Sequence, residues 1–593
     1  MASEVFCKGS HAGFCERVNL AKTVKKIKIY KKERGKLMKR KRIFSGVLAL
    51  AMTVSLFAGC GNTSESGGES SPAANAGGNE STAAAAGEES EQASSSGYQT
   101  TYGSKQFDGV TIQVELFDRE NAPEGSTITD NRWTKYIQDE MGKVGINVEF
   151  VAVPRADEVD KLTSMMAGGI APDIVLTYTY SIAKDYYDQG GVWNLSEFVD
   201  GEGQAENLKA YLGEDVLDMG RTNGEELYGI VAKRATTARS NFFVRKDWMD
   251  ELGISVPTTV DEVYDMVDQM VHNNPDGRTD VIGSTIWDDG YFMAAFSKLA
   301  SDPVQSLISC KLTRDYVDEG MKDFYRFRNK MYNNGLLHPE YYALPTDDYI
   351  GYIVNGSMAT FEDHVGSNID SRNGYALQTL RENDPEADIV AIPPLENIWD
   401  GKQYSTTYSQ GGLIAFCPKT ADAETVEACV TYLDWLCTEA GGITITQGFE
   451  GEHFEYDEDG VPSVIDADYN TADKDWISGD LFITGNGGFF ETVDDYNKAT
   501  SKKYPGYEDY FITDQEYALM GDHIEDIDDS LYTSPSQAEL AADINLVRDE
   551  WLVKVITCPE SEFDANWDSY MAALKDAGVE TVHEERTAYF EAQ

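Results

Sequence analysis

A repeated alternation of strand and helix patterns constrains this chain more than any other feature. Strands are indicated where apolar and polar side chains alternate, and helices where apolar residues recur every three or four positions. The pattern gives a strand over 109–117, a helix over 133–141, a strand over 146–150, a helix over 159–167 and a strand over 172–176. The last of these is a short, continuous apolar run, which is typical of a buried parallel strand. This order predicts an α/β fold with doubly wound sheets, whose ligands bind at the carboxyl ends of the strands.

Two later helices are predicted by their apolar period. Thr259 and Glu262 are spaced as a capping box, in which each side chain accepts a hydrogen bond from the other residue's backbone. Apolar side chains then recur at helical spacing over 263–271. A second apolar face runs over 426–437 and includes Trp435, which we expect in the core.

Length and charge narrow the class of protein. The chain has 593 residues, whereas single cores usually stop growing at about 250–300 residues, so at least two lobes are expected. The first 59 residues hold 14 of the 49 basic residues and 3 of the 102 acidic ones, which leaves 35 against 99 and a net charge of −64. Such an acidic body lacks the basic surface that nucleic-acid binding requires.

The N-terminal region has the pattern of a secretion signal. Residues 38–42 are a basic cluster, and residues 43–58 carry no charge. The uncharged run is short for a membrane span. It ends in Ala58-Gly59-Cys60, which resembles the bacterial lipobox; Phe57 departs from its usual aliphatic or small residue. The resemblance implies cleavage before Cys60 and a diacylglycerol on its sulfur, at the outer face of the cytoplasmic membrane, and an uncleaved or ordinary signal stays an alternative.

The segments on either side of the signal have no folded pattern. Residues 1–37 precede the signal and indicate an upstream start-site artefact. Residues 38–59 are the predicted signal peptide. Residues 60–106 are dominated by Gly, Ser, Ala, Glu, Asn and Thr, which predicts a flexible tether between a lipid and a folded body.

The five cysteines that follow Cys60 show neither a metal nor a redox motif. They are Cys310, Cys417, Cys429, Cys437 and Cys558. An odd number cannot all pair internally, and neither a C-x-x-C pair nor zinc-ligand spacing occurs. Cys429 and Cys437 lie on the predicted 426–437 helix, so we expect them to fill core space.

Signatures of common enzyme classes are missing from the sequence. There is no H-E-x-x-H, no G-x-S-x-G and no P-loop. Among 99 acidic residues a glycosidase carboxylate pair cannot be dismissed by counting, so an enzyme stays an alternative. The prediction is a protein that is not an enzyme.

Five segments, taken together and in this order, resemble extracellular solute-binding protein family 1 in its long Gram-positive lipoprotein branch. They are residues 161–175, with a helix, two glycines and Pro-Asp-Ile entering a strand; 228–259; 335–340; 355–359; and 434–454. Ser357 stands where the family pattern usually has Lys. The order and spacing of these segments, rather than any one of them, carry the resemblance.

The resemblance implies a fold, a function and partners. The fold is two α/β lobes of the type II periplasmic-binding-protein kind, joined by crossover segments. A ligand in the cleft draws the lobes together, and the closed form docks on the permease of an ABC importer. The family captures oligosaccharides without catalysis and without a required cofactor, and we expect a monomer. The predicted segments are lobe 1 over 107–238 and 386–445, and lobe 2 over 239–385 and 446–593.

One loop raises the possibility of calcium. Asn274, Asp276 and Asp280 fall at positions three, five and nine of an EF-hand-like loop. His272 stands at position one, where Asp is wanted, and Gly283 at position twelve, where a bidentate Glu is wanted. A structural calcium site and a plain Asp-Gly turn are both open.

Ligand contacts are predicted from the polar and aromatic residues near strand ends and crossovers. Sugar sites combine aromatic platforms with carboxylates, amides and guanidinium forks. The predicted ligand-binding residues are Tyr178, Tyr180, Arg239, Asn241, Trp287, Glu362, His364, Tyr408 and Phe490. We expect His364 and Glu362 to follow a strand near residues 355–359, while Arg245, Asp247 and Trp248 open a helix and are interpreted as structural.

The identity of the ligand stays open at this point. Lys233, Arg234 and Arg239 near the first crossover would suit a sugar that carries a carboxylate, or they are paired with the many acidic residues. A neutral oligosaccharide and a uronate oligosaccharide are therefore both compatible with the sequence. A peptide or other small solute on the same scaffold, and a surface enzyme or adhesin, are the alternatives.

Overall fold

The computed structural model describes residues 106–222, 225–286, 289–369, 376–525 and 533–592. Cys60, the signal segment and the tether lie outside these ranges, so the predicted lipid anchor stays a prediction. Trp287 also lies outside them, and so does its predicted ligand contact.

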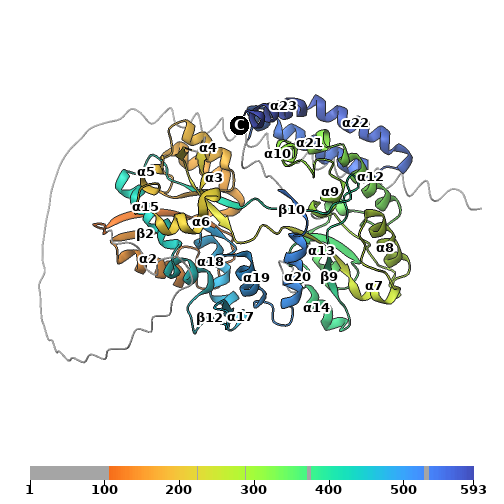
Figure 1. Cartoon of the computed structure of the whole chain (residues 1–593), viewed down its shortest axis with the longest axis horizontal. Coiled ribbons are helices and arrows are strands. Elements are labelled where there is room, and N and C mark those ends of the chain that lie inside the picture. Colours follow the sequence, from red (N-terminus) through yellow and green to blue (C-terminus); the bar gives the residue numbers. More distant parts are fainter. Residues whose placement is uncertain (1–105, 223–224, 287–288, 370–375, 526–532, 593) are drawn as a thin grey trace, which may run out of the picture. The chain divides into compact units, whose positions relative to one another are not determined.

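Short strands and helices alternate along most of the chain (Figure 1). The strands are β1 Val110–Asp118, β2 Ile146–Pro154, β3 Val175–Thr177, β4 Arg221–Thr222, β5 Glu226–Leu227, β6 Ile230–Arg234, β7 Ser240–Arg245, β8 Thr360–His364, β9 Ile389–Ile392, β10 Tyr404–Thr407, β11 Gly411–Phe416, β12 Phe454–Tyr456, β13 Pro462–Val464, β14 Gly485–Asn486 and β15 Asp522–Glu525. The helices are α2 Arg132–Gly142, α3 Glu158–Gly168, α4 Tyr180–Asp188, α5 Ser196–Val199, α6 Glu206–Asp218, α7 Lys246–Leu252, α8 Val260–His272, α9 Gly290–Phe296, α10 Pro303–Ile308, α11 Arg314–Val317, α12 Gly320–Asn333, α13 Thr346–Val354, α14 Ala376–Asn383, α15 Ala423–Leu436, α16 Thr444–Gln447, α17 Ala467–Asn470, α18 Trp476–Leu481, α19 Val493–Ser501, α20 Glu508–Ala518, α21 Pro535–Thr557, α22 Phe563–Asp576 and α23 Val579–Glu591.

One sheet forms the centre of the first core. Its order is β14-β6-β11-β3, and a parallel bridge between Val114 and Ile174 continues it into the parallel pair β1-β2. Strand β11 runs antiparallel to both of its neighbours. Strands β3 and β11 are buried along their whole length, because helices such as α6 and α15 pack against this sheet. The apolar cluster around the sheet draws on residues 107–232 and 413–489.

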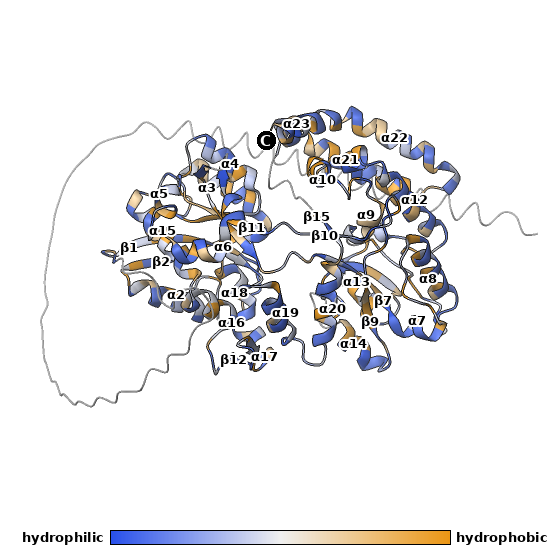
Figure 2. Ribbon diagram, viewed as in Figure 1, coloured by the Kyte–Doolittle hydropathy of each residue, from blue (hydrophilic) through white to orange (hydrophobic). Residues whose placement is uncertain are grey.

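A second, antiparallel sheet of order β8-β7-β9 has an apolar cluster on each face. Phe242 and Val244 point into one cluster and Phe243 into the other, because successive side chains of a strand face opposite ways. Helices α8, α12 and α22 contribute to the first of these clusters. Figure 2 shows the hydrophilic residues lying along the outer faces of helices such as α8 and α22.

The local patterns of the sequence are confirmed where the chain is periodic. Strands β1 and β2 and helices α2, α3, α8 and α15 occur where they were predicted. Helix α8 begins with the predicted capping box between Thr259 and Glu262. Helix α3 ends at Gly169, whose φ of 61° lies in the left-handed region that favours glycine. Trp435, Cys429 and Cys437 are buried in the core, as expected.

One local prediction is wrong. Glu362 and His364 were expected to follow a strand near residues 355–359, but they lie within the strand itself, β8. The apolar residues 358 and 359 follow a turn and lead into the strand. Strand β8 pairs with β7, and the buried residues Phe243 and Phe361 lie opposite each other in the two strands. A polar strand in a core is not indicated by alternation, because its partners lie far away in the sequence.

The crossover segments bring distant parts of the chain together. Ala238, in the segment that follows β6, forms an antiparallel bridge with Thr407 at the end of β10. Strand β10 pairs in parallel with β15. The predicted lobe boundaries remain predictions; residues 445–489 supply Ile477, Phe482 and Phe489 to the core that β1 and β11 also line.

No helix in the described part of the chain has both the length and the apolar composition that a membrane crossing requires.

Candidate functional site

Four of the predicted ligand-binding side chains are engaged in the fold. Glu362 is fully buried; it accepts a hydrogen bond from the Tyr291 backbone at 2.6 Å and pairs with Arg328 at 2.8 Å. It thereby fixes the start of α9 against α12. These contacts do not test whether Glu362 also binds a ligand, so that role stays a prediction.

Tyr180, Asn241 and Phe490 are also buried. The Tyr180 hydroxyl donates to the Gly412 carbonyl at 2.7 Å, and the Asn241 side chain donates to the Asp514 carbonyl at 2.9 Å. Phe490 packs in a small apolar cluster with Val461 and Ala499. These contacts give each side chain a role in packing, and their ligand roles stay predictions.

The other predicted residues on the crossovers gather around one aromatic ring. The Arg234 guanidinium lies 4.4 Å from the centre of the Tyr408 ring, and that of Arg239 lies 5.8 Å from it. The His364 ring is stacked on Tyr408, with centres 6.5 Å apart and planes 26° apart. We call these four residues the Tyr408 cluster. Its members come from the ends of β6, β8 and β10 and from the start of β7, so strand ends position the site.

Backbone bonds hold the Tyr408 cluster in place. The Tyr408 N–H donates to the Thr237 carbonyl at 2.9 Å, and the Arg234 N–H donates to the Gln410 carbonyl at 2.9 Å. His364 Nδ1 lies 3.0 Å from the Asp363 carboxylate, which also accepts a hydrogen bond from the Tyr349 hydroxyl at 3.0 Å. The cluster is half-buried, so its charges are partly shielded from water.

The two cationic side chains at the end of β6, Lys233 and Arg234, bond to backbone carbonyls. Arg234 Nε donates to the Gly411 carbonyl at 3.0 Å, and Lys233 Nζ donates to the Tyr211 carbonyl at 3.0 Å. Burial lowers the pKa of Lys233 from its ordinary value. Among the described residues, no carboxylate forms an ion pair with either side chain, although the chain is strongly acidic.

Tyr178 belongs to a second group, at the carboxyl end of β3. Its ring stacks on Phe117 with centres 6.1 Å apart, and the Arg155 guanidinium lies 4.7 Å from the Tyr178 ring. Arg155 also pairs with Glu158 at 2.7 Å. A pocket of about 450 Å³ is lined by residues 155–160 together with Tyr178 and Thr179. The sequence predicted Tyr178 but missed Arg155, because the short turn before α3 gives no periodic signal.

Strand β1 holds a buried acidic residue that the sequence did not single out. Glu115 in β1 is fully buried, and burial raises its pKa to about 8. Its Oε2 accepts a hydrogen bond from the Leu176 backbone at 3.2 Å, while Oε1 has no partner among the described residues. Alternation predicted a solvent-facing position here, but both faces of β1 are buried from Val114 onward.

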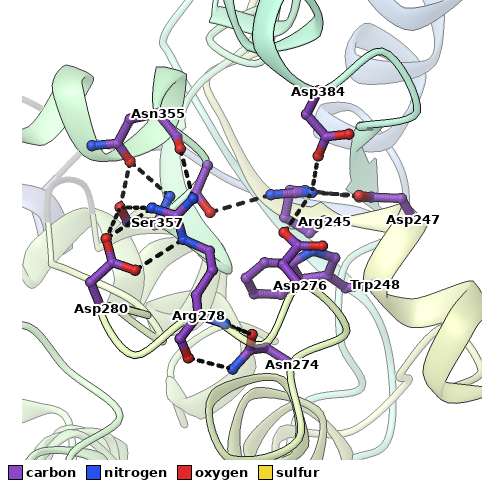
Figure 3. Close-up of polar contacts among 11 residues, drawn as sticks. Arg245, Asp247, Trp248, Asn274, Asp276, Arg278, Asp280, Asn355, Ser357 and Asp384 are labelled. Atoms are coloured by element: carbon purple, nitrogen blue, oxygen red, sulfur yellow. Dashed lines mark hydrogen bonds and ion pairs between the residues drawn. The ribbon is translucent and has the colours of Figure 1, made fainter.

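The three predicted calcium ligands lie in one loop, where each is already bonded within the protein (Figure 3). The Asp280 carboxylate accepts hydrogen bonds from Arg278 Nε at 3.0 Å and from Arg278 Nη2 at 2.8 Å. The Asn274 side-chain oxygen accepts the Arg278 backbone N–H at 2.7 Å. The Asp276 carboxylate accepts Trp248 Nε1 at 3.1 Å and lies 3.8 Å from Arg245 Nη2.

The ends of this loop also lack calcium ligands. His272 turns back to Asp268 at 3.2 Å, and Gly283 has no side chain. A Cβ at Gly283 would lie 2.5 Å from the Leu336 carbonyl oxygen, so no acidic side chain fits position twelve. Across the described ranges, no group of three or more His, Cys, Asp and Glu side chains is placed to hold a metal ion. The donor set does not fit calcium.

Comparison with known proteins gives the class. Residues 125–443, more than half of the chain, match the family of bacterial extracellular solute-binding proteins. The chain therefore belongs to this family, which confirms the resemblance found in the sequence.

Two curated relatives from Bacillus subtilis match about half of the chain. The polygalacturonan/rhamnogalacturonan-binding protein YtcQ is 24% identical over 322 residues, which cover 52% of this chain and 61% of the relative. Lipoprotein LipO is 23% identical over 330 residues, which cover 54% of this chain and 63% of the relative. The chain thus spans less than two thirds of the length of the relatives it matches.

Solved structures extend the likeness in fold over most of the described chain. An alginate-binding protein, AlgQ2, crystallised without calcium, has a TM-score of 0.56 at 16% identity and covers 83% of this chain and all of its own. An HMO-binding solute-binding protein from Bifidobacterium longum infantis has a TM-score of 0.57 at 15% identity and covers 81% of this chain and 98% of its own. The two-lobed periplasmic-binding-protein-like fold is thereby confirmed.

Proposed function

We propose that this chain is an extracellular binding protein that captures an oligosaccharide and delivers it to the permease of an ABC importer. The observation that carries the proposal is the Tyr408 cluster, which gathers two guanidinium groups, an imidazole and an aromatic ring at strand ends of a solute-binding fold. Polar forks and aromatic rings of this kind are what sugar recognition uses. The name of the polygalacturonan/rhamnogalacturonan-binding relative YtcQ agrees with this ligand class.

The proposed mechanism is closure of two lobes around the ligand. The pocket beside Tyr178 and Arg155 belongs to the first core, and the Tyr408 cluster lies on the crossovers. A ligand that contacts both would favour the closed arrangement by its differential affinity, and hinge segments would absorb the change. The permease then distinguishes loaded from empty protein by shape, so the binding protein needs no turnover and no metal.

The proposed location is the outer face of the cytoplasmic membrane. A diacylglycerol on Cys60 and the tether over 60–106 would hold the monomeric body near the permease. The lipoprotein among the relatives agrees with this anchor. Labelling with a radioactive fatty acid in the native host tests it: the unsubstituted protein should carry the label and Cys60→Ala should not, and an unlabelled unsubstituted protein would contradict the anchor.

Thermal unfolding with a ligand panel tests the function. The chain from residue 61 onward, which keeps the whole described fold, is mixed with neutral oligosaccharides, uronate oligosaccharides and peptides. A ligand at 100 times its dissociation constant should stabilise the fold by about 2.7 kcal/mol, a readable rise in Tm. A sugar hit with no product formed supports the proposal; a hit confined to peptides, or a sugar that is cleaved, overturns it.

A further inference from the structure

Arg234 has a cationic side chain whose charge the described protein does not balance. It is half-buried at the end of β6, and its Nε donates to the Gly411 carbonyl. No acceptor among the described residues takes a hydrogen bond from either Nη atom, and no carboxylate pairs with it there. A partly desolvated cation without a counter-ion is unfavourable, unless a ligand supplies the charge.

Other shielded arginines of the chain show what is missing at Arg234. Arg221 pairs with Asp200 at 2.6 Å, Arg278 with Asp280 at 2.8 Å and Arg381 with Asp388 at 3.1 Å. The chain has 102 acidic residues, so a counter-ion is normally close at hand. Its absence at Arg234, in the middle of the Tyr408 cluster, distinguishes this position from a structural ion pair.

Stacking engages the flat face of the Arg234 guanidinium, while its Nη edge has no hydrogen-bond acceptor among the described residues. The guanidinium lies over the Tyr408 ring at 4.4 Å, which orients the group through its flat face. Its Nη hydrogens lie in the plane of the group, away from that face. A carboxylate can therefore approach in the plane and accept two parallel hydrogen bonds, the arrangement that arginine forms best. Arg239, 5.8 Å from the same ring, adds a second positive charge.

We propose that Arg234, held on the Tyr408 ring, binds a carboxylate of the ligand, and that the cargo is a uronate oligosaccharide rather than a neutral one. This proposal rests on the proposed function and specifies its ligand class. The strong negative charge of the rest of the chain would repel such a ligand, so this local positive site is what selects it.

Calorimetric titration with a matched pair of ligands tests the proposal. Trigalacturonate and its fully methyl-esterified form share one carbon framework and differ in charge. The unsubstituted chain from residue 61 onward should bind the acid about 10- to 100-fold more tightly than the ester, as expected for charge-assisted hydrogen bonds. Arg234→Met keeps the apolar stem and should remove that preference, while Arg234→Lys keeps the charge without the fork and should restore part of it.

Arg326→Met is the matched control. Arg326 also lies on an aromatic ring, at 4.4 Å from Phe563, but it pairs with Asp564 at 2.8 Å. This variant should leave both affinities unchanged. Equal binding of acid and ester overturns the uronate proposal and leaves the oligosaccharide function standing, as does acid binding that Arg234→Met does not weaken. If no sugar of any kind binds, the proposed function itself fails.

A separate observation supports a second inference, about the loop over 272–283. Figure 3 shows Arg278 between Asp280 and the turn that holds Asn355 and Ser357. Arg278 Nη1 donates to the Asn355 carbonyl at 3.2 Å, and Nη2 donates to the Ser357 hydroxyl at 3.1 Å. Arg245 Nη1 reaches the Gly356 carbonyl of the same turn at 3.3 Å. Two guanidinium groups thus neutralise the loop and tie it to the turn.

We infer that Arg278 and Arg245 do in this loop what a divalent cation does in a calcium loop, and that the loop does not bind calcium. Both carboxylate oxygens of Asp280 accept hydrogen bonds from Arg278, and a cation beside that guanidinium would be repelled. The geometry at Gly283 removes the position-twelve ligand as well.

Calcium titration of the chain from residue 61 onward tests this inference. Millimolar calcium chloride and EDTA should give the same Tm, and calorimetry should detect no calcium binding. Arg278→Gln should lower the Tm equally with and without calcium. A rise in Tm with calcium, or measurable calcium binding by the unsubstituted protein, would overturn the inference, whatever the variant does.

Discussion

Arg245 and Arg234 make the same stack with opposite consequences. Arg245 lies 4.5 Å from the Trp248 ring and Arg234 lies 4.4 Å from the Tyr408 ring. Arg245 is 1% exposed and has Asp247 and Asp384 as counter-ions, at 2.8 Å from Nε and 3.2 Å from Nη2. Arg234 has a single backbone carbonyl. The comparison shows that stacking alone does not tell a structural arginine from a ligand-binding one; the counter-charge does.

The largest effect expected is on stability, at the paired arginine. Arg245→Met leaves Asp247 and Asp384 without their cation and breaks the contact with the Gly356 carbonyl. Removing one partner of a buried ion pair costs about 3 kcal/mol. Urea denaturation of the variant should show a loss of that size in the free energy of unfolding.

Arg234→Met provides the contrast in the same assay. Because the described protein gives Arg234 no counter-ion, its removal should change the free energy of unfolding by less than about 1 kcal/mol. A loss at Arg234 equal to that at Arg245 would mean that Arg234 is structural too.

Glu115 is a buried acidic side chain without a cationic partner among the described residues, and it keeps its proton instead of a charge. Burial raises its pKa to about 8, from an ordinary value of 4.5. Between those pH values the folded protein holds a proton that the unfolded chain has lost, so the free energy of unfolding falls as the pH rises through the window. At pH 7 the difference from a permanently neutral side chain is about 3 kcal/mol.

Glu115→Gln should remove this pH dependence. The variant should match the unsubstituted protein near pH 4.5 and exceed it increasingly up to about pH 8, where the difference levels off. Urea denaturation of both proteins across this range isolates the effect, because all other groups cancel in the difference. A constant offset at every pH would show that Glu115 does not titrate in the window.

The sequence predicted those parts of the fold that depend on local period. Strand β1, helix α3 and the capped helix α8 each show their pattern within about a dozen residues. The insertion of β11 between β3 and β6 was not predictable in this way. It joins Ile414 to Thr177 and Val231, residues far apart in the sequence, and no local pattern records such a pairing.

For the candidate site, too, sequence position was predictable and the partners of each side chain were not. Tyr178 and His364 were predicted because they were expected to follow strands, and Arg239 and Tyr408 because they lie near expected crossovers. Glu362 carries the same signal, yet it is buried against Arg328, which comes from helix α12. Whether a charged side chain is satisfied within the protein depends on such partners, so pairing and its absence at Arg234 become visible only in the structure.

The Tyr180 hydroxyl makes a smaller stabilising contact among the predicted site residues. Tyr180→Phe removes the hydrogen bond to the Gly412 carbonyl and leaves that oxygen unpaired in the core. The free energy of unfolding should fall by about 1 kcal/mol, the usual net value of a buried hydrogen bond. Ligand affinity measured by calorimetry then separates the two roles, because unchanged affinity would contradict the predicted ligand contact of Tyr180 and a selective loss would support it.

The smallest effect on stability is expected at Arg326, where an ion pair lies at the surface. Arg326 is paired with Asp564 and stacked on Phe563, as Arg245 is paired and stacked, but its side chain is 43% exposed. Lys322 also contacts Asp564 at 2.9 Å and keeps that carboxylate paired when Arg326 is replaced. Exposed pairs gain little over water, so Arg326→Met should shift the Tm by at most about 1 °C in differential scanning calorimetry. A shift as large as that of Arg245→Met would mean that pairing stabilises this fold even at the surface. In that case the burial of an arginine would not decide how much its ion pair stabilises the fold. The missing counter-ion of the half-buried Arg234 would then be weaker support for a ligand carboxylate there.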